Sequence, residues 1–138
     1  MGFFKKLFRS DNENTGGRFK TEQEYAQNRA RQLTMTPMTV AQLRQFGVTD
    51  ESQLKLEYFF YTNAEEKAAA LAQEFASMGY DGKVERSAAN KKQFVVTGWT
   101  SKMQMDQQTV LDWTARMCDL GRQHDCEFDG WGTSPKQT

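Results

Sequence analysis

Polar and hydrophobic residues alternate from Leu54 to Tyr58, and an unbroken aromatic run, Phe59 to Tyr61, follows. Alternation with a period of two is typical of a β-strand whose two faces meet different surroundings. Because Phe59 and Tyr61 occupy the face that is polar earlier in the stretch, both faces of this strand are expected to be covered or to form a binding surface. The pattern therefore predicts that Leu54 to Thr62 is a central strand of a sheet.

Two helices are predicted before this strand. Thr21 and Glu24 have the spacing of a capping box, in which each side chain satisfies a free backbone amide, so a helix is expected from about residue 22 to about residue 33. Thr36 and Pro37 indicate a second helix start, and Gly47 indicates where that second helix ends. Both helices are expected to lean on the strand that begins at Leu54.

Helical and strand patterns alternate in the rest of the chain. Helices are predicted after Asn63, whose spacing to Glu66 is that of a cap, and after Asp106. Strand candidates lie near residues 83–87, 93–99 and 126–131. This order predicts an α+β fold, a ferredoxin-like βαββαβ sandwich with a four-stranded sheet and two helices on one face. The first and third strands are expected to form the central pair and to run parallel.

The chain is predicted to divide into three parts. Residues 1–20 form a flexible basic amphipathic tail and linker, residues 21–53 an N-terminal helical extension, and residues 54–138 the ferredoxin-like domain. A helix over the first nine residues would place basic side chains on one side and hydrophobic ones on the other. Such a segment can lie on an anionic membrane surface or dock into a groove of a partner, and a frayed tail is the alternative. The hydrophobic side chains are Phe3, Phe4, Leu7 and Phe8.

Charge is balanced overall but uneven along the chain. Eighteen basic and eighteen acidic side chains cancel across 138 residues, so no global field attracts nucleic acid or anionic membrane. Residues 1–20 hold five basic and two acidic side chains, whereas residues 104–133 hold six acidic and two basic ones. The sequence shows neither an apolar run long enough to span a membrane nor a secretion signal, which predicts a cytoplasmic protein.

Residues that commonly carry catalysis are few. His124 is the only histidine, and Cys118 and Cys126 lack the close spacing of redox or zinc sites. Carboxylates at Asp125 and Glu127 alternate along a strand, but acid–base catalysis needs a cleft around them. The sequence predicts a protein that is not an enzyme and has no cofactor and no metal site.

Three aromatic side chains are predicted on the sheet face opposite the helices: Phe59, Tyr61 and Trp99. With parallel central strands they would gather at one end of the sheet. They could stack the bases of single-stranded nucleic acid, as in RNA-recognition modules, although acidic neighbours would repel phosphate. Alternatively, the N-terminal helices cover them as ordinary core, or a protein partner or a second copy of the chain covers them in a complex or homodimer.

The segment from Phe128 to Thr133, FDGWGT, resembles the end of the domain found in the regulator of ribonuclease E activity B (RraB) family. The likeness extends back to the strand at Leu56–Tyr61 and covers about residues 54–133. The resemblance implies a ferredoxin-like fold, no catalysis, and inhibition of ribonuclease E through its basic C-terminal region. It also implies an acidic contact surface with partner-binding candidates Asp119, Asp125, Glu127, Asp129 and Trp131.

The resulting prediction is a non-catalytic, protein-binding regulator of RNA decay in bacteria. Two alternatives remain open. One is a single-stranded nucleic-acid-binding module that uses the aromatic sheet face. The other is a membrane-peripheral adaptor held through residues 1–9.

Overall fold

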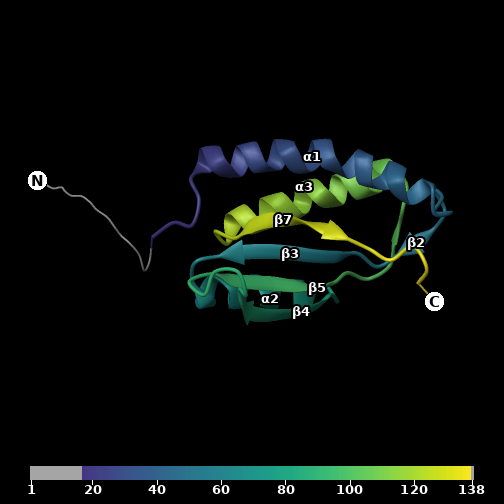
Figure 1. Ribbon diagram of the computed structural model, residues 1–138. Coiled ribbons are helices and arrows are strands. Elements are labelled where there is room, and N and C mark those ends of the chain that lie inside the picture. The colour runs from purple at the N-terminus through teal and green to yellow at the C-terminus, as the bar shows by residue number, and fades with distance from the viewer. Residues whose placement is uncertain (1–16, 138) are drawn as a thin grey trace, which may run out of the picture.

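The computed structural model describes residues 17–137 and shows a mixed α+β fold. The predicted membrane or docking residues Phe3, Phe4, Leu7 and Phe8 lie outside the described residues. Figure 1 labels the elements, which are α1 (Glu22–Arg44), β2 (Gln53–Leu54), β3 (Glu57–Thr62), α2 (Glu65–Ser77), β4 (Asp81–Arg86), β5 (Phe94–Trp99), β6 (Met103–Gln104), α3 (Gln107–Gln123) and β7 (Glu127–Gly132).

Four strands form an antiparallel sheet in the order β4-β5-β3-β7, and β2 pairs with β6 in a separate two-stranded sheet. The central position predicted for the Phe59 strand is confirmed, but its predicted start is wrong, because β3 begins at Glu57. Just before Glu57 the ladder with β5 becomes irregular: the Thr100 amide donates to the Leu56 carbonyl at 2.9 Å, but the Leu56 amide donates to the Thr100 hydroxyl at 2.9 Å instead of to the backbone. Leu54 then pairs with Met103 in the smaller sheet.

The prediction that the two central strands run parallel is also wrong. β3 and β5 are antiparallel, because β5 returns from a hairpin with β4 after the α2 crossover. Trp99 therefore lies opposite Glu57, while Phe59 lies opposite Thr97 and Tyr61 opposite Val95. The three predicted aromatic residues are spread along the sheet and do not gather at one end.

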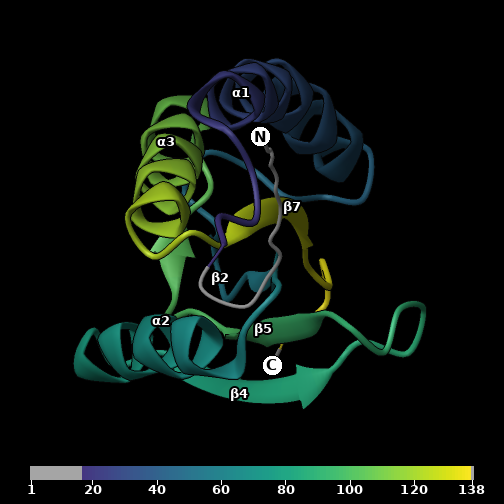
Figure 2. The same cartoon turned by 90° about the vertical axis from the view of Figure 1, so that its left-hand side faces the viewer.

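Helices α2 and α3 lie on the same side of the sheet, and α1 packs on α3 beyond the β7 edge (Figure 2). The core between the helices and the sheet is rich in aromatic rings. Tyr58 and Phe60 of β3 reach it from the sheet, and the Tyr58 ring lies 4.7 Å from that of Phe75 on α2. Among the described residues no helix lies over the middle of the opposite face, but α1 borders it at the β7 edge, where α1 and Phe59 line one hollow.

The N-terminal region forms one helix where two were predicted. The capping box of Thr21 and Glu24 is present, but α1 continues through Pro37 to Arg44. An interior proline costs a helix about 3 kcal/mol, so packing must offset that cost. The buried Thr36 hydroxyl makes part of the stabilising contacts. It lies 2.9 Å from the Thr114 hydroxyl of α3 and accepts a hydrogen bond from the Trp131 indole at 3.0 Å.

Asn63 does not cap α2, contrary to its spacing from Glu66. Ala64 is the N-cap residue and makes no side-chain cap hydrogen bond. The Asn63 side chain is bonded elsewhere, donating to the Gly17 carbonyl at 3.2 Å and accepting from the Lys67 ammonium at 2.9 Å. Contacts with the segment before α1 therefore outweigh the local capping pattern.

Candidate functional site

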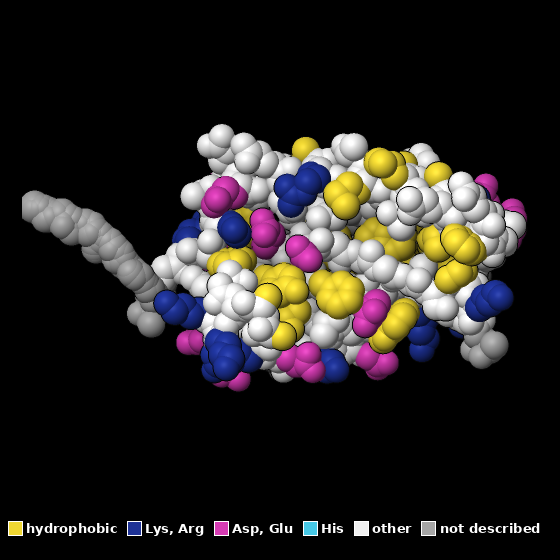
Figure 3. All heavy atoms as spheres, in the orientation of Figure 1, with side chains coloured by type: hydrophobic (Ala, Val, Ile, Leu, Met, Phe, Trp, Pro, Cys, Tyr) yellow, Lys and Arg dark blue, Asp and Glu magenta, His cyan; other side chains and the backbone are white. Residues whose placement is uncertain are grey.

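The open face of the sheet, defined here as the face opposite α2 and α3, carries a row of half-buried aromatic side chains. Tyr61, Phe59 and Trp99 follow one another along the face, because each belongs to the set of alternate residues that points away from the core. Figure 3 shows hydrophobic side chains across the middle of this face, with acidic side chains beside them. Partly exposed aromatic side chains that share one face of a sheet can form part of a binding surface.

Carboxylates are the commoner charged groups on the strands of this face. The pairing registers place Glu57, Asp81, Glu85 and Glu127 on the open face, and Asp129 lies at its edge beside Tyr61 and Glu127. On the three strands β3, β4 and β5, Lys83 is the cation of this face, and its ammonium lies 3.2 Å from the Glu85 carboxylate. Lysines border both ends of the row: Lys20 lines the hollow at Tyr61, and Lys55, Lys102 and Lys136 line a hollow beside Trp99. The strands themselves therefore present more negative than positive charge next to the aromatic rings.

Glu127 is the clearest case of a carboxylate on this face without an ion pair among the described residues. The side chain lies opposite Tyr61 and is half-buried. Burial raises the pKa of the Glu127 carboxyl, and the nearby charges of Lys20 and Arg31 only partly oppose that rise. Within residues 17–137, no cation lies within 4.0 Å of this carboxylate.

A β-bulge determines where Trp131 points. Phe60 pairs with Phe128 but Phe59 pairs with Gly130, so Asp129 is the extra residue and Gly130 has a φ of 136°. After the bulge the side-chain alternation is inverted, which turns Trp131 towards the helices. Its indole contacts the Trp113 ring edge-on at 6.3 Å between centroids. Trp131 thus packs between the sheet and α1, away from the open face.

Asp125 is used inside the protein. Its carboxylate accepts hydrogen bonds from the Lys67 ammonium, the Tyr25 hydroxyl and the Phe19 backbone amide, each at 2.6 Å. Burial opposes the charged form, but these hydrogen bonds outweigh it, and the pKa of Asp125 is lowered. The carboxylate joins the segment before α1 to α2 and to the start of β7.

Asp119 is likewise paired, since the Arg29 guanidinium donates to its carboxylate at 3.0 Å. Of the five residues that the family resemblance implied, the structure therefore brings Glu127 and Asp129 to the aromatic row. It places Asp119, Asp125 and Trp131 in contacts with α1, α2 or α3. The partner-binding role of each residue stays a prediction.

Sequence reasoning placed Thr97 on the open face with the aromatic residues, but it did not single out Glu57 or Asp81 as members of that face. Glu57 has the same alternation as Phe59, so that signal was available. Asp81 could not be placed without the antiparallel register, which sets it opposite Trp99. Two hollows of about 250 Å³ and 310 Å³ lie at the Trp99 and Tyr61 ends of the row.

The cysteine and histidine side chains are buried or paired in the structure. No group of three metal-ligating side chains occurs among them, and none of their helices is long and apolar enough to cross a membrane. Burial raises the pKa of both cysteine thiols, Cys118 and Cys126, to about 12, which makes them poor nucleophiles. His124 contacts Glu74 at 2.9 Å on the helix side of the sheet.

Comparison with known proteins agrees with the sequence resemblance. A comparison with curated protein sequences found no significant match. The family model described as regulator of ribonuclease activity B matches residues 34–133, which include the second half of α1 and every strand. Because this match covers most of the chain, the protein belongs to the regulator of ribonuclease activity B family.

Proposed function

We propose that this protein regulates RNA decay by binding a basic segment of a ribonuclease, such as the C-terminal region of ribonuclease E, on the open face of its sheet. The observation that carries the proposal is the row of half-buried aromatic rings flanked by carboxylates, of which Glu57, Asp81 and Glu127 have no cation within 4.0 Å among residues 17–137. The family to which the chain belongs is named for ribonuclease regulation. The activity is binding, with no chemical step.

This surface suits basic, extended chains for two physical reasons. Lysine and arginine side chains are attracted to the faces of aromatic rings, and the attraction adds to their pairing with carboxylates. Glu127 is expected to contribute to the binding free energy. A partner cation beside it would offset the cost of holding a half-buried carboxylate without a counter-charge.

The finer structural assignments belong to the same proposal. The strand order β4-β5-β3-β7, with α2 and α3 on one side, supports the ferredoxin-like arrangement expected from the sequence. The division at residues 20 and 53 stays a prediction, and the family match begins at residue 34, inside α1. Homodimer formation and a cytoplasmic location also stay predictions.

Direct binding tests the proposal. The full-length chain is immobilised and titrated with the purified C-terminal region of ribonuclease E, at salt concentrations from about 0.05 M to about 0.5 M. We expect binding that weakens as salt rises and that the Asp129→Lys variant abolishes at physiological salt. The matched control is Asp112→Lys, which makes the same charge change at an exposed site on α3. Absence of binding at the lowest salt, or equal loss in both variants, contradicts the proposal.

One observation favours single-stranded nucleic acid as a second candidate ligand. Trp99 also borders a hollow of about 470 Å³ that contains three lysines, Lys55, Lys102 and Lys136. A base stacked on Trp99 could place its phosphate beside them. In that case labelled single-stranded RNA binds the protein and Trp99→Ala weakens the complex, and failure to bind at about 10 µM protein dismisses this candidate.

The third alternative, membrane attachment through Phe3, Phe4, Leu7 and Phe8, concerns residues outside the described part of the chain and stays a prediction. Equal partitioning of the full-length chain and a version lacking residues 1–10 into anionic vesicles would contradict it.

A further inference from the structure

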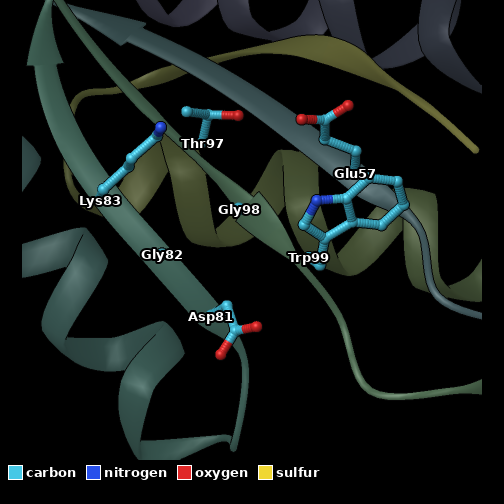
Figure 4. Close-up of a pocket in the computed structure, with 7 residues that line it drawn as sticks. All are labelled: Glu57, Asp81, Gly82, Lys83, Thr97, Gly98 and Trp99. Atoms are coloured by element: carbon cyan, nitrogen blue, oxygen red, sulfur yellow. The ribbon is translucent and has the colours of Figure 1, made fainter.

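The hollow at the Trp99 end of the open face has an unusual polar group in its wall. Figure 4 shows the hollow, of about 250 Å³, between strands β4, β5 and β3. Thr97 contributes its side chain, which is 8% exposed. Its hydroxyl has no hydrogen-bond partner among the residues that the structure describes. A buried hydroxyl without a partner costs stability. The oxygen itself is covered from solvent, so a ligand that supplies a donor reaches it only after the side chains around the hollow move aside.

An aromatic ring and two carboxylates complete the hollow. Trp99 lies between Glu57 and Asp81, because both residues pair with it across the sheet. In Figure 4 the Glu57 side chain lies beside the indole ring, and Asp81 lies on the neighbouring strand. In the described part of the chain, neither carboxylate is within ion-pair distance of a cation.

These groups select a cation that is also planar. A guanidinium has a flat face that stacks on an indole and five N–H donors at its edge, whereas an ammonium is a compact, strongly hydrated charge. The donors of one guanidinium can be shared between a carboxylate and a hydroxyl, whose oxygens both accept. The third charged residue of the hollow, Lys83, is paired with Glu85. Lys55, Lys102 and Lys136 line the adjoining hollow, which shares Trp99 and Asp81, but among the described residues none of them lies within 4.0 Å of the Glu57 or Asp81 carboxylate.

We infer that this hollow, formed by Trp99, Glu57, Asp81 and Thr97, binds the side chain of an arginine in an extended basic peptide and prefers it to lysine. The inference rests on the proposed function for the identity of the partner, and it adds the residue that the partner must carry. A hydrogen bond from the guanidinium would satisfy the Thr97 hydroxyl, which has no partner among the described residues.

The test uses two blocked pentapeptides, Gly-Gly-Arg-Gly-Gly and the same peptide with lysine, added to the isotopically labelled full-length chain. The indole N–H signals report the position of binding. The Trp113 and Trp131 indoles donate within the core, to Tyr80 and Thr36, so the Trp99 signal is distinct in environment. We expect the arginine peptide to move the Trp99 signal, and the lysine peptide to need about a tenfold higher concentration.

Three variants separate binding from folding. Thr97→Val removes the hydroxyl at nearly constant volume, and Glu57→Gln removes one charge. Each is expected to weaken arginine binding several-fold while leaving the Trp113 and Trp131 signals unchanged. Asp112→Asn removes a charge from exposed α3 and is expected to bind like the original chain.

The outcomes are distinguishable from those of the proposed function. Equal shifts with arginine and lysine, or Thr97→Val and Glu57→Gln variants that bind like Asp112→Asn, overturn the arginine site even if the ribonuclease segment still binds. Arginine-selective shifts at Trp99 support the site even if the ribonuclease segment fails to bind, and in that case only the identity of the partner is wrong.

Discussion

Two sets of carboxylates in this protein differ in whether a cation pairs with them. Asp119 and Asp125 lie near α1, and their charges are matched by Arg29 and Lys67 at 3.0 Å and 2.6 Å. Glu57, Asp81 and Glu127 lie on the open face, where the described residues place no cation within ion-pair distance. The comparison teaches that negative charge along a sequence does not by itself mark a contact surface, because part of it holds the fold together.

The pKa directions express the same contrast. Hydrogen bonds lower the pKa of Asp125 in spite of burial, so its charged form stabilises the folded state. Burial raises the pKa of Glu127, so its charged form destabilises the folded state. Residues that reduce stability while remaining able to meet a partner are common at functional sites. Stability measurements can therefore separate the two sets without knowledge of the partner.

The largest expected effect is that of Asp125→Ala. It leaves the Lys67 ammonium and the Tyr25 hydroxyl without their acceptor, and the backbone of Asp125 has a φ of 55°, which alanine tolerates less well. We expect the free energy of unfolding to fall by about 2–4 kcal/mol in urea titrations. Asp119→Ala is the matched control, and loss of its half-exposed pair with Arg29 should cost about 0–1 kcal/mol. Equal losses in the two variants would contradict the assigned role of Asp125.

The pH dependence of Asp125 follows from its lowered pKa. Its stabilising contribution is fully present above the pKa of the unfolded chain and is lost as pH falls through the lower, folded value. Asp125→Asn retains a residue type that adopts positive φ but removes the charge. The stability difference between the original chain and this variant should shrink below about pH 4.

The second-largest expected change in the free energy of unfolding concerns the β-bulge that turns Trp131 towards the helices. Gly130 has a φ of 136°, a conformation that residues with a Cβ rarely adopt. Gly130→Ala should lower the free energy of unfolding by about 1–3 kcal/mol and shift the Trp131 indole signal, because the hydrogen bond to Thr36 would be disturbed. Gly132→Ala, two residues on and with nothing within 4 Å of an added Cβ, is the control. An unchanged Trp131 signal in Gly130→Ala would show that the bulge does not direct this side chain.

The bulge also shows why the sequence predicted the fold better than the site. Local patterns were sufficient for the central strand, for the Thr21 capping box and for the helix that follows Asp106. Trp131 could be placed on either face until the register shift at Phe59 was known. The role of Asp125 depends on its contacts with residues 19–25, and the continuation of α1 through Pro37 depends on contacts with α3. Local spacing in the sequence reveals neither set of contacts. The relative direction of β3 and β5 determines where the aromatic side chains lie. Parallel strands would have gathered Phe59, Tyr61 and Trp99 at one end of the sheet, whereas the antiparallel pair spreads them in a row.

The smallest expected effect, that of a substitution at Glu127, tests the contrast between the two sets of carboxylates most directly. It should increase the free energy of unfolding, whereas substitutions at Asp125 should decrease it. Glu127→Gln removes a half-buried carboxylate whose pKa is raised, so we expect the free energy of unfolding to increase at neutral pH by less than about 1 kcal/mol. The gain should disappear as pH falls through the pKa of Glu127, since the original side chain then becomes neutral as well. Paired urea titrations at pH 7 and pH 4 measure both trends, with Asp112→Asn as a control for the loss of an exposed charge. A loss of stability at pH 7 would show that Glu127 belongs with Asp125, as a carboxylate that the fold itself requires, and would remove the strongest electrostatic reason for placing a basic partner on the open face.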